Sequence, residues 1–306
     1  MRALFLGTPS AAVPTLAALT GAAEVVGVVT QPDAPRGRSK HLVAPPVKAA
    51  AEEWGIPVYQ PGAADELQSV TESVEFDVGV VVAFGRILRP DFLASSPYGF
   101  LNVHFSLLPR WRGAAPVERA ILSGDETTGV AIMQLDAGMD TGPVIAVREV
   151  EILEDDTAGG LTARLSHIGA DLLIDSISDY VHGRRTPAPQ ISGGATLAPR
   201  LTTAEARLDG SVGAVEAERM VRGFNPRPGA WMMVDGDRIK VFAARLDESR
   251  VPPGTVAFVD SRALVGFQGG ALELITVQPA GHRPMTGAEW GNGRRHQPGV
   301  VEAPDS

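Results

Sequence analysis

The chain has 306 residues, 44% of them hydrophobic, a formal net charge of −9 and no cysteine. This size and composition favour one large domain with a smaller second one, and they exclude a disordered or fibrous protein. Without cysteine there is no disulfide framework, thiolate nucleophile or zinc–thiolate site, so we expect a cytoplasmic protein. The first apolar run, residues 3–6, is too short for a signal peptide or a membrane span.

Strand and helix patterns alternate in the first third of the chain. Apolar runs typical of buried strands occupy residues 3–6, 25–29, 56–59, 78–83 and 100–104. Helical patterns lie between several of them, at residues 13–19, 47–54 and 64–70. This alternation predicts an α/β fold with a doubly wound, mostly parallel, Rossmann-like sheet and helices on both faces. The turn after the first strand has neither a G-x-G-x-x-G motif nor a Walker lysine, so we expect no nucleotide cofactor there.

The second half divides into a helix, a linker and a second domain. A helix over residues 160–181 is predicted to end the first domain, at residues 1–183, and residues 184–203 have the basic, Pro- and Gly-rich composition of a linker. Short apolar runs separated by turns follow at residues 230–234, 239–243, 255–259, 263–267 and 272–277. They predict that residues 204–306 form a small, OB-like β-barrel. We expect its tail, residues 294–306, to be frayed.

The most informative residues are an amide, an imidazole and a carboxylate. Period-two alternation puts Asn102 and His104 on one face at the C-terminal end of a predicted strand. In open α/β sheets, ligands bind at that end. Asp140 stands in a loop between Gly138 and Gly142, where the backbone can approach a ligand closely. Together these side chains predict one polar site.

Such a site suits acyl transfer to an amine. The reaction needs donors for the carbonyl oxygen as it becomes an oxyanion, and a route for the proton that leaves the nitrogen. Asn102 and His104 can be the donors, and Asp140 can position His104 and pass a proton through water. Each residue also has a structural interpretation, as a cap, a core histidine or an Asx-turn. Spacing alone therefore leaves the reaction open.

Two other kinds of site are less well supported. A metal site could combine His104, Asp140 and His41, but the chain has no H-x-x-x-H or H-E-x-x-H pair, so we expect no metal. A hydrolase based on Ser106 is weak, because this serine lies outside a G-x-S-x-G motif.

Several motifs resemble the formyltransferase family that uses 10-formyltetrahydrofolate. They are Asn102-Val103-His104, Ser106-Leu107-Leu108-Pro109 and Asp140 within residues 136–142, with further likeness at residues 5–9, 30–33, 83–88 and 224–231. The resemblance covers nearly the whole chain. Within the family, it is strongest to the members that act on methionyl initiator tRNA.

The resemblance implies a reaction and a set of site residues. The chain would transfer the formyl group of 10-formyltetrahydrofolate to the α-amine of methionyl initiator tRNA without a metal, and Asn102, His104 and Asp140 would be its catalytic residues. The implied folate-binding residues are Ser106, Leu107, Leu108, Pro109, Phe84, Gly85, Arg86, Ile87, Leu88 and Asp136. Around Arg86 the main chain, rather than the guanidinium, is expected to contact the pterin.

A basic loop follows the second predicted strand, at residues 33–41. The resemblance implies that it enters the tRNA acceptor stem through Arg36, Arg38 and Lys40, with Arg38 as the principal contact. On charge alone, a solvated loop is an equal alternative. The C-terminal domain would support the tRNA. We expect a monomer whose partners are initiator methionyl-tRNA and folate, with no membrane.

The chain departs from the family at three positions and leaves two rival functions. Phe105 replaces a small residue and could alter packing beneath the folate slot. Ser39 and His41 replace glycine and lysine and could slightly weaken phosphate attraction. The rivals are a formyltransferase for a small amine, such as an amino-sugar nucleotide or glycinamide ribonucleotide, and a folate- or RNA-binding module without catalysis.

Overall fold

The computed structural model describes residues 1–35, 41–191 and 193–303. The chain folds into two compact units, and each is described by itself. The first unit comprises Met1–Pro116, Thr127–Glu151 and Thr162–Ala198. The second comprises Val117–Glu126, Ile152–Leu161 and Pro199–Ser306.

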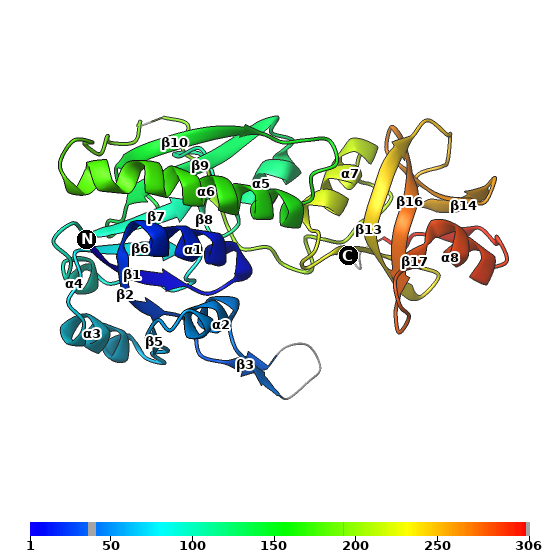
Figure 1. Ribbon diagram of the computed structural model, residues 1–306. Coiled ribbons are helices and arrows are strands. Elements are labelled where there is room, and N and C mark those ends of the chain that lie inside the picture. The colour runs from blue at the N-terminus through cyan, green and yellow to red at the C-terminus, as the bar shows by residue number, and fades with distance from the viewer. Residues whose placement is uncertain (36–40, 192, 304–306) are drawn as a thin grey trace. The chain divides into compact units, whose positions relative to one another are not determined.

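A seven-stranded sheet forms the centre of the first unit (Figure 1). In spatial order its strands are β10 (Val144–Glu151), β9 (Thr127–Gln134), β7 (Phe100–His104), β6 (Val78–Val82), β1 (Arg2–Gly7), β2 (Glu24–Val29) and β5 (Val58–Tyr59). Neighbours from β7 to β5 are parallel, whereas β9 and β10 continue the sheet antiparallel. The predicted fold class is therefore confirmed. The sequence patterns predict no strand between residues 104 and 160, where β9 and β10 lie.

Helices cover both faces of this sheet. They are α1 (Val13–Ala22), α2 (Pro46–Glu53), α3 (Ala64–Ser73), α4 (Pro90–Leu93) and α6 (Ala158–Val181), with a 3-10 turn at Ser10–Ala12. Figure 1 shows α1 and α6 over the same face. Helix α6 approaches β7 closely at Gly169, where a Cβ would lie 2.7 Å from Val103 Cγ1 and 3.6 Å from the ring of Phe105. Phe105 thus packs against α6, on the face that Val103 shares.

The opposite face of the sheet carries Asn102 and His104, because side chains alternate along a strand. In the same register, Leu6 of β1 pairs with Val81 of β6, and Val81 pairs with Asn102. Apolar side chains of α3 and α4 join Leu6 and Val81 in one buried cluster. Asn102 and His104 therefore lie on β7, on the same face of the sheet as this apolar cluster.

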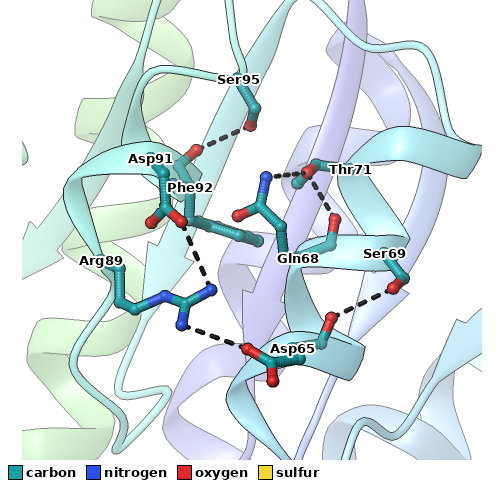
Figure 2. Close-up of polar contacts among 8 residues, drawn as sticks. All are labelled: Asp65, Gln68, Ser69, Thr71, Arg89, Asp91, Phe92 and Ser95. Carbon is teal, nitrogen blue, oxygen red and sulfur yellow. Dashed lines mark hydrogen bonds and ion pairs between the residues drawn. The ribbon is translucent and has the colours of Figure 1, made fainter.

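Polar contacts beside this cluster link α3 to the residue just before α4 (Figure 2). Phe92 of α4 packs on Phe100 with ring centroids 4.9 Å apart. Arg89, just before α4, donates to Asp65 of α3 at 3.2 Å and lies 3.3 Å from Asp91. These exposed ion pairs contribute little energy, but they hold the end of the segment that leaves β6.

The second unit is an antiparallel sheet that nearly closes on itself. Its strands are β12 (Ala230–Val234), β13 (Asp237–Asp247), β14 (Thr255–Val259), β15 (Arg262–Phe267), β16 (Gly270–Pro279), β17 (Met285–Thr286) and β18 (Gly299–Val300), and its helices include α5 (Pro116–Ser123), α7 (Ala214–Gly223) and α8 (Gly287–Gly293). The order is β12-β13-β16-β15-β14-β18, and a bridge between Val234 and Val301 joins the two ends. This barrel confirms the predicted small β-domain.

The expectation of a frayed tail from residue 294 is wrong for part of that segment. Val300 pairs with Thr255 of β14, and its backbone N–H donates to Asp235 Oδ1 at 3.0 Å. Val301 is buried in the core of the barrel. A short apolar pair after Gly299 therefore covers the gap between β14 and β12, where an open edge would leave backbone groups unpaired.

Candidate active site

His104 lies at the end of β7 with its ring almost fully buried, at 5% exposure. Its Nε2 atom is 2.9 Å from the backbone oxygen of Trp111. A carbonyl oxygen only accepts, so Nε2 carries the proton of this hydrogen bond. The residue that supplies the oxygen, Trp111, has a φ of 62°, in the left-handed region that few non-glycine residues adopt.

Asp140 reaches the same ring from a different loop. Its Oδ2 atom lies 3.7 Å from His104 Nδ1 and accepts a hydrogen bond from the Gly113 backbone at 2.8 Å. Strand β9 ends beside Leu101, at the opposite end of β7 from His104. The loop after β9 must therefore fold back over the sheet to bring Asp140 to the imidazole.

Both ring nitrogens of His104 thus face oxygen atoms. The ring can donate to both only when both nitrogens carry a proton. The 3.7 Å separation between Nδ1 and Asp140 is longer than a direct hydrogen bond, so that edge of the ring is not committed to the carboxylate.

Asn102 has an uncommitted side chain. Within the described part of the chain, no residue forms a hydrogen bond with its carboxamide, which is half-buried two positions before His104 on β7. The structure therefore brings His104 and Asp140 together, and Asn102 lies two positions before His104 on the same face of β7. It leaves the amide of Asn102 free to bind a ligand oxygen.

Residues 106–109 form the turn beside His104. Ser106 is fully buried and donates its hydroxyl to the Arg110 oxygen at 2.6 Å, so it shapes the turn. Pro109 is buried and Leu108 half-buried. Leu107 lies against β9, where a Cβ on Gly129 would come within 2.5 Å of its side chain. Residues 106–109, which were predicted to bind the folate, therefore offer mainly apolar surface.

The segment at residues 84–88, after β6, offers backbone groups. Phe84 and Leu88 are buried, whereas Ile87 is 95% exposed. Gly85 has a φ of 80°, which favours glycine at this exposed turn. Arg86 donates to the Pro61 oxygen at 2.7 Å, so its guanidinium is used within the fold.

Asp136, also predicted for the folate site, braces its own loop. Its Oδ1 atom accepts from the Gly138 backbone at 3.0 Å and from Thr141 Oγ1 at 2.8 Å. This is the local side-chain-to-backbone bonding typical of aspartate in turns. The carboxylate thereby fixes the loop that carries Asp140.

The predicted RNA contacts Arg36, Arg38 and Lys40, and the departure at Ser39, lie outside the described residues. The flanking strands β3 (Ala34–Pro35) and β4 (Leu42–Val43) pair antiparallel. At their base, Lys48 donates to Asp33 and to Gln60 Oε1, each at 2.9 Å. Hydrogen bonds from Gln60 and then Lys48 lower the pKa of Asp33.

Two further polar residues contact the site and were not predicted. Gln190 donates to the Asp140 oxygen at 2.8 Å, and Thr196 Oγ1 accepts from the Trp111 backbone at 2.9 Å. Both stand in the segment expected to be a linker, at residues 184–203. One glutamine and one threonine among prolines and glycines carry little signal before the tertiary contacts are known.

Neither a metal cluster nor a membrane span occurs in the described ranges. No group of three His, Asp or Glu side chains there is arranged to hold a metal ion. Among the helices of residues 1–35, 41–191 and 193–303, none is long and apolar enough to cross a membrane.

The chain matches two family models. The model described as formyl transferase matches residues 1–177, and the model described as formyl transferase, C-terminal domain, matches residues 200–295. Among curated proteins, the methionyl-tRNA formyltransferase of Renibacterium salmoninarum is 44% identical over 98% of this chain and 99% of its own length. That of Halorhodospira halophila is 46% identical over 97% of this chain and 98% of its own length.

Solved structures share the fold at lower identity. An N-formyltransferase from Helicobacter canadensis, in complex with folinic acid and dTDP-3-aminofucose, has a TM-score of 0.70 at 17% identity and covers 90% of this chain and 98% of its own. HypX from Aquifex aeolicus, in complex with tetrahydrofolic acid, has a TM-score of 0.66 at 17% identity and covers 95% of this chain. The chain spans about half of HypX, 47%.

Proposed function

The chain belongs to the formyl transferase family, and we propose that it transfers the formyl group of 10-formyltetrahydrofolate to the α-amine of methionyl initiator tRNA. Relatives named for this activity share 44–46% identity over nearly the whole length of both chains. The observation that carries the proposal is their joint coverage of both units, combined with an amide, an imidazole and a carboxylate that meet beside β7. The relatives thus support tRNA as the acceptor, and the three side chains support the formyl-transfer chemistry.

The reaction exchanges one C–N bond for another. The neutral amine attacks the formyl carbon, the carbonyl oxygen gains negative charge, and the bond from that carbon to N10 of the folate breaks. One proton leaves the attacking nitrogen and one joins N10, so charge and atoms balance. The residues need to stabilise the oxygen and to move that proton.

Asn102 is the proposed donor to the formyl oxygen, because its carboxamide is uncommitted within the described structure. A fixed neutral N–H needs no reorganisation as charge develops on the oxygen. The Nδ1 edge of the His104 ring faces Asp140, since its Nε2 is used by Trp111. With the ring doubly protonated, that edge is a second donor.

Asp140 is the proposed acceptor for the proton. Its Oδ2 atom lies near His104 Nδ1 without a direct hydrogen bond, so Nδ1 stays available to a water or a substrate group. The carboxylate also stabilises positive charge on the imidazole. The hydrogen bond from Gly113 keeps it pointed at the ring.

The folate is proposed to lie between the segment at residues 84–88 and the turn at residues 106–109. The first has an exposed glycine backbone and the exposed Ile87 side chain, and the second has half-buried leucines. A pterin has an amide-like edge that backbone groups can read inside an apolar slot. Asp136 supports this slot through its loop.

The basic loop is proposed to contact the tRNA, and the barrel to support it. For Arg38→Ala we expect a lower kcat/KM for tRNA and a flatter salt dependence, because one phosphate contact is lost. Formyl transfer at saturating tRNA should be little changed. A salt dependence equal to that of the unaltered protein would remove Arg38 from the RNA contact.

The discriminating experiment offers three acceptors with 10-formyltetrahydrofolate: methionyl initiator tRNA, an amino-sugar nucleotide and glycinamide ribonucleotide. We expect formylation of the tRNA alone. Transfer to a small acceptor but not to tRNA would contradict the proposal, and folate binding without transfer would indicate a binding module. A cytoplasmic location and a monomeric state are part of the proposal, and the mass in solution tests the latter.

A further inference from the structure

We propose that Gln190 is a positioning residue of the formyl-transfer site, which fixes the backbone on both sides of Asp140. The expected effect of Gln190 on the rate of formyl transfer rests on the proposed function. Its structural part depends only on contacts within the first unit. Gln190 is half-buried and lies 50 positions along the chain from Asp140, outside every motif recognised in the sequence.

The side-chain amide of Gln190 has all its hydrogen-bonding groups in use. Its Nε2 atom donates to the Asp140 oxygen at 2.8 Å and to the Gly142 oxygen at 2.9 Å. Its Oε1 atom accepts from Arg112, at 3.1 Å from Nε and 2.6 Å from Nη2. Two N–H donors and one carbonyl acceptor are what glutamine has at its end.

These partners determine which residue type fits. The two backbone oxygens need donors, and the guanidinium needs an acceptor. Glutamate would keep the acceptor but lose both donors, and alanine would lose all four contacts. The network therefore requires an amide and also fixes which way the amide points.

The Asp140 backbone needs such a support. Asp140 has a φ of 53°, in the left-handed region that is unfavourable for residues with a side chain, although aspartate adopts it more readily than most. Its carboxylate is held by the Gly113 N–H and its carbonyl by Gln190. The side chain can face His104 only while both ends of the residue are held.

The same amide links the two loops of the site. Arg112 precedes Gly113, whose N–H binds the Asp140 carboxylate. Gln190 therefore joins the loop that carries Asp140 to the loop that binds Nε2 of His104 through Trp111. A shift of one loop relative to the other changes the separation between His104 Nδ1 and Asp140.

The segment that carries Gln190 is itself anchored at both ends. Ala188 exchanges backbone hydrogen bonds with Val144 at 2.8 Å in each direction. Strand β11 (Leu197–Ala198) pairs in parallel with β8 (Arg112–Gly113). Glycine is needed at residue 113, because a Cβ there would lie 2.8 Å from the Ala198 oxygen.

The test compares Gln190→Ala and Gln190→Glu with Gln68→Ala in the full chain. Gln68 is the matched control, because it lies on α3 and its amide reaches only Thr71 in Figure 2. For both Gln190 variants we expect kcat to fall by about 10- to 100-fold, with KM for folate and tRNA changed less than about threefold. Gln68→Ala should retain its kcat.

A double-mutant cycle separates positioning from a general structural role. In an Asp140→Asn background, Gln190→Ala should lower kcat by less than about threefold, because the group it positions is gone. If the two losses multiply in full, Gln190 acts independently of Asp140 and the proposal is overturned. An unchanged kcat in Gln190→Ala would also overturn it.

Amide hydrogen exchange in the ligand-free protein tests the positioning of Asp140 without relying on the proposed activity. Gln190→Ala should speed exchange of the Gly113 amide by at least about tenfold, because the carboxylate that accepts its hydrogen bond becomes mobile. Unchanged exchange contradicts the positioning role even if the protein formylates tRNA. Faster exchange in a protein that formylates none of the acceptors would contradict the proposed function and leave the positioning of Asp140 in place.

Discussion

The polar groups of the two units are used differently. In the first unit, the Asn102 carboxamide has no partner among the described residues, and His104 and Asp140 are 3.7 Å apart. In the barrel, the buried Glu273 carboxylate accepts from Arg245 at 2.8 Å, and Asp235 accepts from the Val300 backbone at 3.0 Å. In the first set the Asn102 amide and the Nδ1 edge of His104 stay available to a ligand, while the second set is satisfied within the protein.

This difference indicates that the first unit carries the reacting groups and that the barrel carries polar groups that stabilise the fold. A polar group that is held in place but not paired can bind a substrate without first breaking a bond to the protein. A paired group contributes to the fold. Changes in the barrel should therefore alter stability, and changes beside β7 should alter the rate.

The largest effect on stability is expected from Trp290→Ala. Trp290 is 5% exposed in the barrel core and packs edge-on against Phe258 with ring centroids 5.6 Å apart. Its removal should cost about 3–5 kcal/mol of unfolding free energy, measured by urea denaturation. Trp54→Ala, at a side chain 41% exposed, should cost much less. A loss of kcat in the folded Trp290 variant would contradict the division between support and chemistry.

A large effect on the rate is expected from Asp140→Asn in the first unit. This substitution removes the charge beside His104 and the proton acceptor, so kcat should fall by about 10²-fold or more. Unfolding by urea and folate binding should be close to those of the unaltered protein. Retention of most of the activity would assign the proton route to another group.

The smallest effect is expected from Asp235→Asn, on stability alone. The hydrogen bond from the Val300 backbone, and then Arg294, lower the pKa of Asp235 below its ordinary value of 3.8. The carboxylate thus stabilises the barrel above that pH and loses this contribution as pH falls through the lowered pKa. Because the side chain is 42% exposed, the loss near pH 7 should stay below about 1 kcal/mol.

Urea denaturation of the two proteins at several pH values checks this sign. The difference between them should shrink as the solution is acidified below pH 3.8. A difference that grows with acid would mean that the pKa of Asp235 is raised in the fold.

Much of the fold follows from local patterns in the chain. Buried runs alternating with helices predict the parallel strands, and period-two spacing predicts that Asn102 and His104 share a face. Strands β9 and β10 were not predicted, although the loop between them carries Asp140. Strand β18 has two residues, too few for any periodicity.

The parts of the site that were missed depend on tertiary structure. The return of Asp140 to His104 follows from the antiparallel direction of β9, which the predicted parallel sheet does not include. The contacts of Gln190 join residues 48 and 50 positions apart. Its segment has the composition of a linker, and its backbone pairing with Val144 and with β8 makes it part of the site.

The most direct test of the central claim is the single-turnover rate of Asn102→Ala with 10-formyltetrahydrofolate and methionyl initiator tRNA, both saturating. If Asn102 donates to the formyl oxygen, the rate should fall by about 10²- to 10³-fold while folate binding and unfolding free energy stay unchanged. A rate within about twofold of the unaltered protein would show that the uncommitted amide beside β7 does not contact the reacting oxygen.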